Sequence, residues 1–137
     1  MQEYIHKVQY YETDKMGIVH HSNYIRWFEE ARIDYLDKIG ISYKSLEGSG
    51  FICPVLSVQC NYKKSVIFGT SVKICTVLKS FGNVRFTFHY VVCDPENGEE
   101  HACGESTHCF IDSDGKVISL KKMAPELFDC FGKHIDA

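Results

Sequence analysis

The chain has 137 residues, which fits a single domain, and we predict one domain over residues 1–137. Apolar residues make up 45% of it and charged residues 24%, which is ordinary for a globular protein and argues against a disordered, collagen-like or membrane-spanning chain. The net charge is −3, whereas proteins that bind nucleic acid usually carry a basic excess, so we expect no nucleic-acid partner.

The N-terminal part of the chain contains one predicted strand and one long predicted helix. Residues 5–11 have the pattern of a strand, and a polar turn that ends at Gly17 follows them. Over residues 22–39, apolar residues recur at steps of three and four, which is the spacing of one helix face. Gly40 comes directly afterwards and suits a left-handed C-cap. Trp27 widens the apolar surface, so we expect this helix to be buried on more than one side.

The rest of the chain changes to the two-residue period of strands. Apolar and polar residues alternate in four stretches, and turn residues such as those at 94–98 separate them. The four predicted strands cover residues 56–62, 72–78, 84–92 and 102–111. The first of them has the alternation of a half-buried strand, and a short helix is predicted to start at Pro125. Strands joined by hairpins beside a segregated helix indicate an α+β fold with an antiparallel sheet.

The predicted helix and sheet also indicate a partner subunit. One curved sheet covers only one side of a helix, so we expect another copy of the chain to cover the remaining apolar surface of residues 22–39. A sheet also has two edge strands with unpaired backbone groups, which proteins usually cover or pair. Pairing across a two-fold axis, the commonest oligomer symmetry, meets both needs.

Seven cysteines are spread along the chain, an odd number with no Cys-x-x-Cys pair, so neither a disulfide framework nor a zinc site is indicated. Several lie in apolar runs, where free cysteine behaves as a small hydrophobe, and disulfides persist mainly outside the cytosol. The first residues lack the apolar stretch of a signal peptide, and no apolar run approaches the roughly 20 residues of a membrane helix. We therefore expect a cytoplasmic protein with reduced thiols, no bound metal and no stable membrane association.

The segment from Tyr10 to Tyr24 contains most of the residues suited to chemistry. It joins the first strand to the long helix, and it holds Asp14 and two histidines just before the helix N-terminus. Helix N-termini present free N–H groups and the positive end of a dipole, which stabilise an oxyanion. A carboxylate beside such donors can act as nucleophile or general base in acyl transfer. An aspartate in a loop is more often a turn residue, so the role of Asp14 stays open on this ground alone.

The same segment closely resembles the signature of hotdog-fold acyl-CoA thioesterases, in particular the 4-hydroxybenzoyl-CoA thioesterase-like group. The matching run is Tyr10-x-x-x-Asp14-x-x-Gly17-x-Val19-x-His21-x-Asn23-Tyr24-x-x-x-Phe28-Glu29-x-Ala31-Arg32. The strand order downstream agrees, and the resemblance covers roughly residues 3–130. It implies a hotdog fold, in which a long central helix is wrapped by a five-stranded antiparallel sheet. It also implies hydrolysis of acyl-coenzyme A by a homodimer or homotetramer, with the active site at the dimer interface.

The resemblance implies roles for five positions. Asp14 matches the catalytic carboxylate of the family, and Tyr10 matches a tyrosine often placed near it. At the position of His21, the backbone N–H polarises the thioester carbonyl, and in this branch a histidine side chain is part of the active site. Gly17 matches a glycine that lets the backbone approach the substrate, and Val19 is assigned to substrate binding with it. No metal or bound cofactor is implied, because coenzyme A is part of the substrate and its thiolate is a good leaving group.

The chain departs from the family after Tyr62, where relatives often have a proline and then a Gly-Asp pair. Residues 63–70 differ from that pattern, which leaves the details of this loop open. Four cations near strand ends suit the phosphates of coenzyme A, or are simply solvated. They are Lys63, Lys64, Lys79 and Arg85, of which Lys63 and Arg85 are assigned to substrate binding.

Alternatives remain for one residue and for the function. Glu29 lies three residues before Arg32, which suits an ion pair on the helix, but some hotdog thioesterases use a helix glutamate as the catalytic carboxylate. A thioesterase or dehydratase acting on acyl carrier protein, or an acyl-CoA-binding module without catalysis, is also open, because fold alone does not fix function. The complete motif around Asp14 favours an acyl-CoA thioesterase. The sequence does not separate direct attack by Asp14 from activation of a water molecule.

Overall fold

The computed structural model describes residues 1–135, which form a five-stranded antiparallel sheet with the strand order β1-β3-β4-β5-β2. The strands are β1 (Gln2–Lys7), β2 (Val55–Tyr62), β3 (Ser71–Phe81), β4 (Arg85–Cys93) and β5 (Glu100–Cys109). The helices are α1 (Ser22–Lys38), α2 (Tyr43–Gly48), α3 (Leu120–Met123) and α4 (Pro125–Gly132), and a short 3-10 turn covers Tyr10–Glu12. The α+β class and the five-stranded antiparallel sheet are as predicted.

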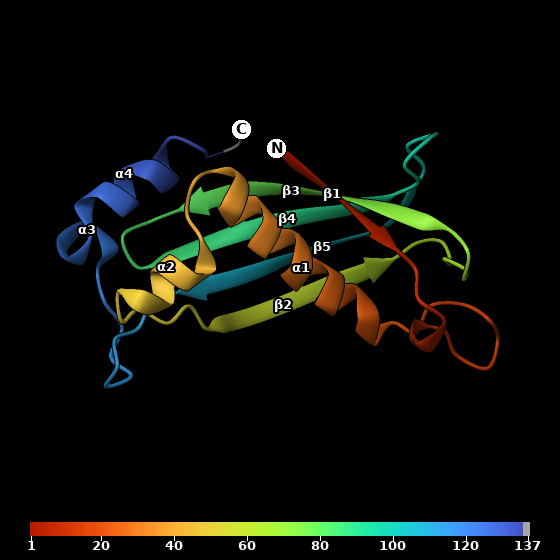
Figure 1. Cartoon of the computed structure of the whole chain (residues 1–137), viewed down its shortest axis with the longest axis horizontal. Coiled ribbons are helices and arrows are strands. Elements are labelled where there is room, and N and C mark those ends of the chain that lie inside the picture. Colours follow the sequence, from red (N-terminus) through yellow and green to blue (C-terminus); the bar gives the residue numbers. More distant parts are fainter. Residues whose placement is uncertain (136–137) are drawn as a thin grey trace.

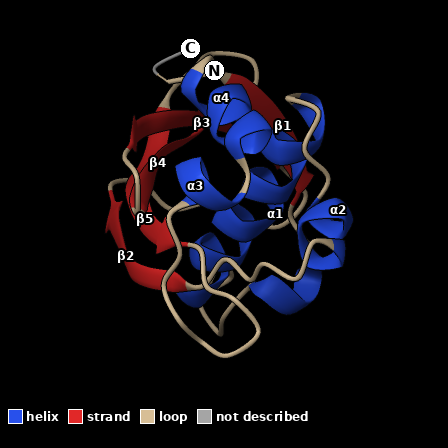
Figure 2. Cartoon of the chain, turned by 90° about the vertical axis from the view of Figure 1, so that its left-hand side faces the viewer, coloured by secondary structure: helices blue, strands red, loops and turns tan. Residues whose placement is uncertain are grey.

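The helices lie on one side of the sheet, as Figure 2 shows. Helix α1 crosses this inner face, while α3 and α4 lie at the end of the sheet where β3 turns into β4 (Figure 1). Within the part of the chain that the structure describes, no helix is both long and apolar enough to cross a membrane. All seven cysteines carry free thiols.

The core lies between α1 and the inner face of the sheet. Alternate residues of β3, β4 and β5 are buried there, because successive side chains of a strand point to opposite faces. The ring of Phe28 stacks on Tyr90, with centroids 4.4 Å apart. A side chain at Gly104 would lie 2.6 Å from the Phe28 ring, so this close approach requires glycine. The buried residues of α1 are Tyr24, Trp27, Phe28, Ala31, Tyr35 and Leu36.

The chain itself buries most of the apolar side chains of α1, so little of this surface is left for a partner subunit to cover. Trp27 is fully buried, because its indole packs on the rings of His6 and Tyr24 at centroid distances of 5.0 and 4.7 Å. The strand β1 and the turn after it thus cover the side of α1 that the rest of the sheet does not reach.

The edge strand β2 carries the exposed apolar residues instead. It was expected to be half-buried, but only Cys60 is, and the other residues of β2 are exposed. The reason is its position: β2 pairs with β5 on one side only, and few residues of α1 reach it. Its large exposed side chains are Val55, Leu56, Val58 and Tyr62.

Element boundaries differ from the prediction mainly at the N-terminus. The first strand covers Gln2–Lys7 rather than residues 5–11, because the N–H of Gln9 binds the Glu12 carboxylate and turns the chain out of the sheet. Helix α1 ends as predicted before Gly40, which has a φ of +90°, and α4 begins at Pro125. The short helices α2 and α3 were not predicted.

Candidate functional site

Asp14 lies in a tight loop between the 3-10 turn and α1. Its Oδ1 accepts a hydrogen bond from the N–H of Met16 at 2.8 Å, and its own N–H donates to the carbonyl of Ile18 at 2.8 Å. The N–H of Gly17 donates to the Asp14 carbonyl at 3.0 Å, and Gly17 has a φ of +79°, which favours glycine. The loop therefore closes on itself and holds the Asp14 carboxylate in a half-exposed position.

The N-terminus of α1 provides hydrogen-bond donors next to this loop. His21 is the N-cap residue, and its carbonyl accepts a hydrogen bond from the Tyr62 hydroxyl at 3.1 Å. The N–H of Ser22 donates to Nδ1 of His20 at 3.2 Å. Within residues 1–135, the N–H of His21 has no hydrogen-bond acceptor. Free N–H groups and the helix dipole make such a terminus a site for negative charge.

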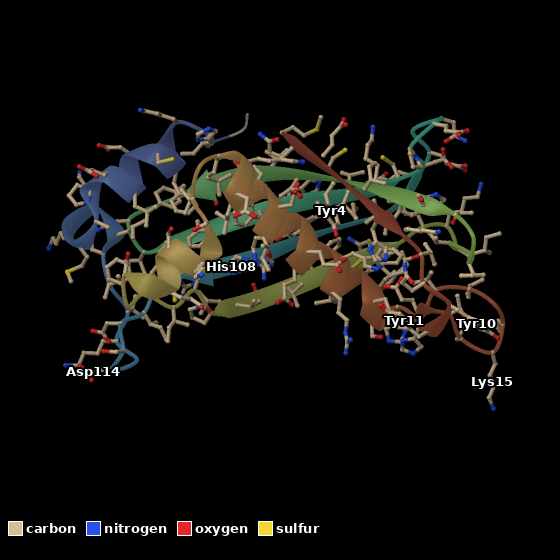
Figure 3. The ribbon with its side chains drawn as sticks, viewed as in Figure 1. Tyr4, Tyr10, Tyr11, Lys15, His108 and Asp114 are labelled. Carbon is tan, nitrogen blue, oxygen red and sulfur yellow. The ribbon has the colours of Figure 1, made fainter. Side chains whose placement is uncertain are left out.

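A pocket of about 470 Å³ joins the Asp14 loop to the start of α1 and the end of β2. The pocket lies at the end of the molecule where α1 begins, and Figure 3 shows Tyr10, Tyr11 and Lys15 at that end. Among the lining residues, Asp14 is the only carboxylate. The residues from the three elements include Asp14, Val19, His21, Tyr24, Tyr62 and Lys63.

Two other groups near the pocket are poorly suited to act as nucleophile or base. Burial raises the pKa of Tyr24 to about 12, and the neighbouring Cys60 and Tyr62 act in the same direction. Burial also raises the pKa of the Cys60 thiol. Because the thiolate and not the thiol is nucleophilic, Cys60 is inert near neutral pH. The other titratable side chains that line the pocket with Asp14 are His21, Tyr62, Lys63 and Lys64.

The structure brings together five of the residues that the sequence pointed to, namely Asp14, Val19, His21, Lys63 and Lys64. Gly17 shapes the Asp14 loop but is not part of the pocket wall. Tyr10 is 73% exposed, its ring lies 5.5 Å from that of Phe68, and it is not among the residues that line the pocket. The role of Tyr10 beside the Asp14 carboxylate stays a prediction.

The predicted phosphate-binding cations are spread over the sheet. Lys63 lines the pocket and forms an exposed ion pair with Glu100. Arg85 is at the start of β4 and pairs with Cys109 of β5, at the opposite end of the sheet from Asp14. Within one chain, Arg85 is therefore not part of the Asp14 pocket. Lys64 also lines the pocket and pairs with Glu99, and Lys79 pairs with Glu105.

The predicted ion pair between Glu29 and Arg32 is wrong. Nη1 of Arg32 donates instead to the hydroxyl of Tyr90 at 3.2 Å, because Arg32 turns toward the sheet. Glu29 and Arg32 line a second, smaller pocket of about 70 Å³ together with Cys53. Glu29 is thus not in the Asp14 pocket of its own chain. Nowhere in residues 1–135 do three His, Cys, Asp or Glu side chains form a group that could hold a metal ion.

Comparison with known proteins identifies the family. The sequence pattern of the Thioesterase-like superfamily matches residues 8–128. The chain belongs to this superfamily. It is 36% identical over 124 residues to a putative esterase of Aquifex aeolicus, covering 90% of this chain and 94% of that protein. It is 30% identical over 128 residues to a putative acyl-CoA thioesterase of Bacillus subtilis, covering 93% of this chain and 92% of that protein.

Solved structures of the superfamily have the same architecture. The crystal structure of a DHNA-CoA thioesterase from Staphylococcus aureus superposes with a TM-score of 0.91 at 36% identity, covering 96% of this chain and 88% of the other. A gentisyl-coenzyme A thioesterase at 22% identity has a TM-score of 0.82 and shows the fold alone. The resemblance to hotdog-fold thioesterases is confirmed, and this superfamily member is a thioester hydrolase.

Two features at and beside the Asp14 pocket were not predicted from the sequence. Tyr62 bonds to His21 across 41 residues, so no local spacing reveals the pair. Glu12 lies two residues before Asp14, and the sequence predicts no role for it. The one feature of the sequence that could have pointed to Glu12 is that a carboxylate there follows two tyrosines and lies close to Asp14.

Proposed function

We propose that this thioester hydrolase cleaves acyl-coenzyme A to a free acid and coenzyme A, with Asp14 as nucleophile or general base. The observation that carries the proposal is the shared pocket of the Asp14 carboxylate and the unpartnered His21 N–H. Relatives named as an acyl-CoA thioesterase and a DHNA-CoA thioesterase support the choice of a coenzyme A thioester.

In this mechanism, the thioester carbonyl oxygen accepts a hydrogen bond from the His21 N–H. Negative charge grows on this oxygen when the carbonyl is attacked. The His21 N–H and the positive end of the dipole of the 17-residue helix α1 stabilise this charge. The His21 side chain lines the same pocket and is exposed, so it is placed to contact the substrate.

The attack on the carbonyl carbon follows one of two routes. In the first, an Asp14 oxygen forms the new bond, the C–S bond breaks, and coenzyme A leaves as thiolate; water then hydrolyses the mixed anhydride and restores Asp14. In the second, Asp14 takes a proton from a water molecule whose oxygen attacks, and the thiolate leaves in the same way. Both routes need the same position of Asp14.

The coenzyme A end of the substrate is assigned to the cations at the pocket mouth. Lys63 and Lys64 both line the pocket and are exposed, and each can exchange its glutamate partner for a phosphate. Arg85 can meet a substrate in this pocket only from another subunit. Tyr10 is exposed at the same end of the molecule as the pocket, where it can contact the substrate, and Gly17 acts by shaping the loop.

The proposal includes an assembly of two or four copies in the cytoplasm. The exposed apolar side chains of β2 lie on an edge strand with unpaired backbone groups, which favours pairing with a second copy. In such a dimer, α1 is the central helix that the hotdog sheet wraps. The seven free thiols agree with a reducing compartment.

Release of free thiol from a panel of acyl-coenzyme A compounds tests the function. The panel contains short, long and aromatic acyl groups, together with one acyl group carried on acyl carrier protein. We expect thiol release from at least one coenzyme A compound and little from the carrier protein. Binding without release would indicate a non-catalytic module, and hydrolysis of the carrier-protein thioester alone would indicate the other class of enzyme.

A further inference from the structure

A buried polar cluster lies directly behind the Asp14 loop. Its buried members are His6 from β1, Glu12 from the 3-10 turn and Trp27 from α1. Glu30 of α1 joins them from the surface, and we call these four residues the Glu12 cluster. Glu12 is 4% exposed, His6 is 9% exposed and Trp27 is fully buried. None of these residues lines the Asp14 pocket.

Three donors converge on the two carboxylate oxygens of Glu12. Oε1 accepts from the N–H of Gln9 at 2.8 Å and lies 2.8 Å from Nε2 of His6. Oε2 accepts from Nε1 of Trp27 at 2.7 Å. The other ring nitrogen of His6 lies 3.1 Å from Oε2 of Glu30, which links the cluster to the surface of α1.

The backbone of Glu12 connects this cluster to the first turn of α1. The Glu12 carbonyl accepts from the N–H of His20 at 2.9 Å and from Nδ2 of Asn23 at 2.8 Å. The segment from Thr13 to His20, which contains Asp14, thus starts next to Glu12 and returns to it. Any shift of Glu12 moves both ends of this segment.

A buried carboxylate is costly unless its partners compensate, and apolar packing is often as stable as a buried ionic group. Burial acts to raise the pKa of Glu12, but the hydrogen bonds from His6, Gln9 and Trp27 outweigh it, so the pKa is lowered. Glu12 is therefore ionised at neutral pH. Because stability alone does not require a buried charge here, we look for its purpose in the neighbouring Asp14 loop, whose position depends on Glu12.

We propose that Glu12 is a positioning residue for thioester hydrolysis: its carboxylate, fixed by His6, Gln9 and Trp27, holds the Asp14 loop in register with the His21 N–H. This inference rests on the proposed function, because it takes Asp14 and His21 as the groups that act on the thioester. Glu12 acts through them and does not touch the substrate.

The substitution Glu12→Gln tests the geometry with almost no change of volume. In Glu12 the Gln9 N–H and Nε1 of Trp27 donate to different carboxylate oxygens. Glutamine has only one acceptor oxygen, so its NH₂ group would face one of these two donors. The loop must then shift, and a small misplacement of reacting groups can cost up to about a hundredfold in rate. We expect kcat to fall by about tenfold or more, with KM changed less than about threefold.

Two variants serve as controls for charge and for stability. Glu105→Gln removes a half-buried carboxylate that pairs with Lys79 on the outer face of the sheet. Phe131→Leu removes volume from the core at α4 and serves as a destabilised variant whose midpoint of thermal unfolding is compared with that of Glu12→Gln. Both should keep kcat within about twofold. Trp27 is the only tryptophan in the chain, so its fluorescence should change in Glu12→Gln and not in Glu105→Gln.

A double-mutant cycle separates positioning from a general structural role. If Glu12 acts through Asp14, then Glu12→Gln should change the residual rate by less than about twofold when Asp14→Asn is already present. An equal loss in both backgrounds, or wild-type kcat in a folded Glu12→Gln enzyme, would overturn the proposal. An active Asp14→Asn enzyme would instead contradict the proposed function, whatever the result at Glu12.

Discussion

The Tyr62 hydroxyl donates a hydrogen bond to the backbone carbonyl of His21, 3.1 Å away, and so ties the end of β2 to the start of α1. The ring of Tyr62 also meets that of Tyr24 edge to face, with centroids 5.0 Å apart. The edge strand β2 thus holds His21 in place, and the N–H of His21 is the donor that we propose for the oxyanion.

Replacing this tyrosine tests the value of that bond. Tyr62→Phe keeps the ring contact with Tyr24 but removes the hydrogen bond, whose net worth is about 1 kcal/mol. We expect kcat/KM to fall about fivefold while the midpoint of thermal unfolding changes little. Tyr11→Phe is a suitable control, since Tyr11 is 81% exposed. Equal effects of the two substitutions would contradict a role for the Tyr62 hydroxyl.

Asp14 gives the strongest prediction for activity. Asp14→Asn retains the shape of the side chain and an acceptor for the Met16 N–H, but loses the nucleophile or base. Thiol release should fall by at least about a hundredfold in a folded enzyme. Near-normal turnover would redirect attention to Glu29.

A second aspartate provides a matched control for the turn. Oδ1 of Asp112 accepts from the N–H groups of Asp114 and Lys116, in a turn that also contains a glycine with positive φ, Gly115. Asp114 lies at the opposite end of the molecule from Lys15 of the Asp14 loop (Figure 3). Asp112→Asn should therefore leave activity unchanged. A similar loss in both variants would indicate that Asp14 matters only for the turn.

Local patterns predicted most of the fold, because apolar residues recur every three or four positions in α1 and alternate with polar residues in most of the strands. The steps of three and four in α1 and the glycine after it correspond to the observed helix and its left-handed cap. The first strand was misplaced, because its end depends on a hydrogen bond from Gln9 to a carboxylate that looks like any polar turn residue.

Contacts between distant parts of the chain were not predictable in the same way. The i to i+3 spacing of Glu29 and Arg32 suggested an ion pair, but Arg32 bonds to Tyr90, 58 residues away in the sequence. The motif pointed to Asp14 and His21 together because the loop and the helix start on which they lie are adjacent in the sequence. Arg85 was chosen by charge alone, and its place at the far end of the sheet depends on strand order.

The buried His108 predicts how stability depends on pH. Burial, together with the nearby Arg32 charge, lowers the pKa of His108 to about 4. Below its ordinary pKa of about 6.5, the imidazole takes up a proton in the unfolded chain but not yet in the folded one. The free energy of unfolding should therefore fall between about pH 6.5 and pH 4, by about 3 kcal/mol at most from this group, and be unaffected above that range.

Urea unfolding at several pH values measures this effect. His108→Gln removes the titrating group and can still bond to Ser106, whose Oγ lies 2.7 Å from Nε2 of His108. The variant is expected to be less stable at pH 7.5 but to lose less stability on acidification than the wild type. Parallel curves for the two proteins would show that other groups cause the acid sensitivity.

The exposed apolar edge strand β2 is where we expect copies of the chain to join. Val55, Leu56 and Val58 are between 42% and 49% exposed on a strand whose outer backbone groups are unpaired within residues 1–135. A charge placed among such residues would be buried without a partner when two copies pair through β2, which is strongly unfavourable. We therefore expect the wild type to be a dimer or tetramer by light scattering at assay concentration, and Val58→Glu to shift it toward a monomer with little or no thiol release. Val84→Glu is a matched control, since Val84 is 40% exposed and lies just before β4, outside the edge strand. An active wild-type monomer of about 15.7 kDa, or a fully active monomeric Val58→Glu enzyme, would show that the site is complete within one chain.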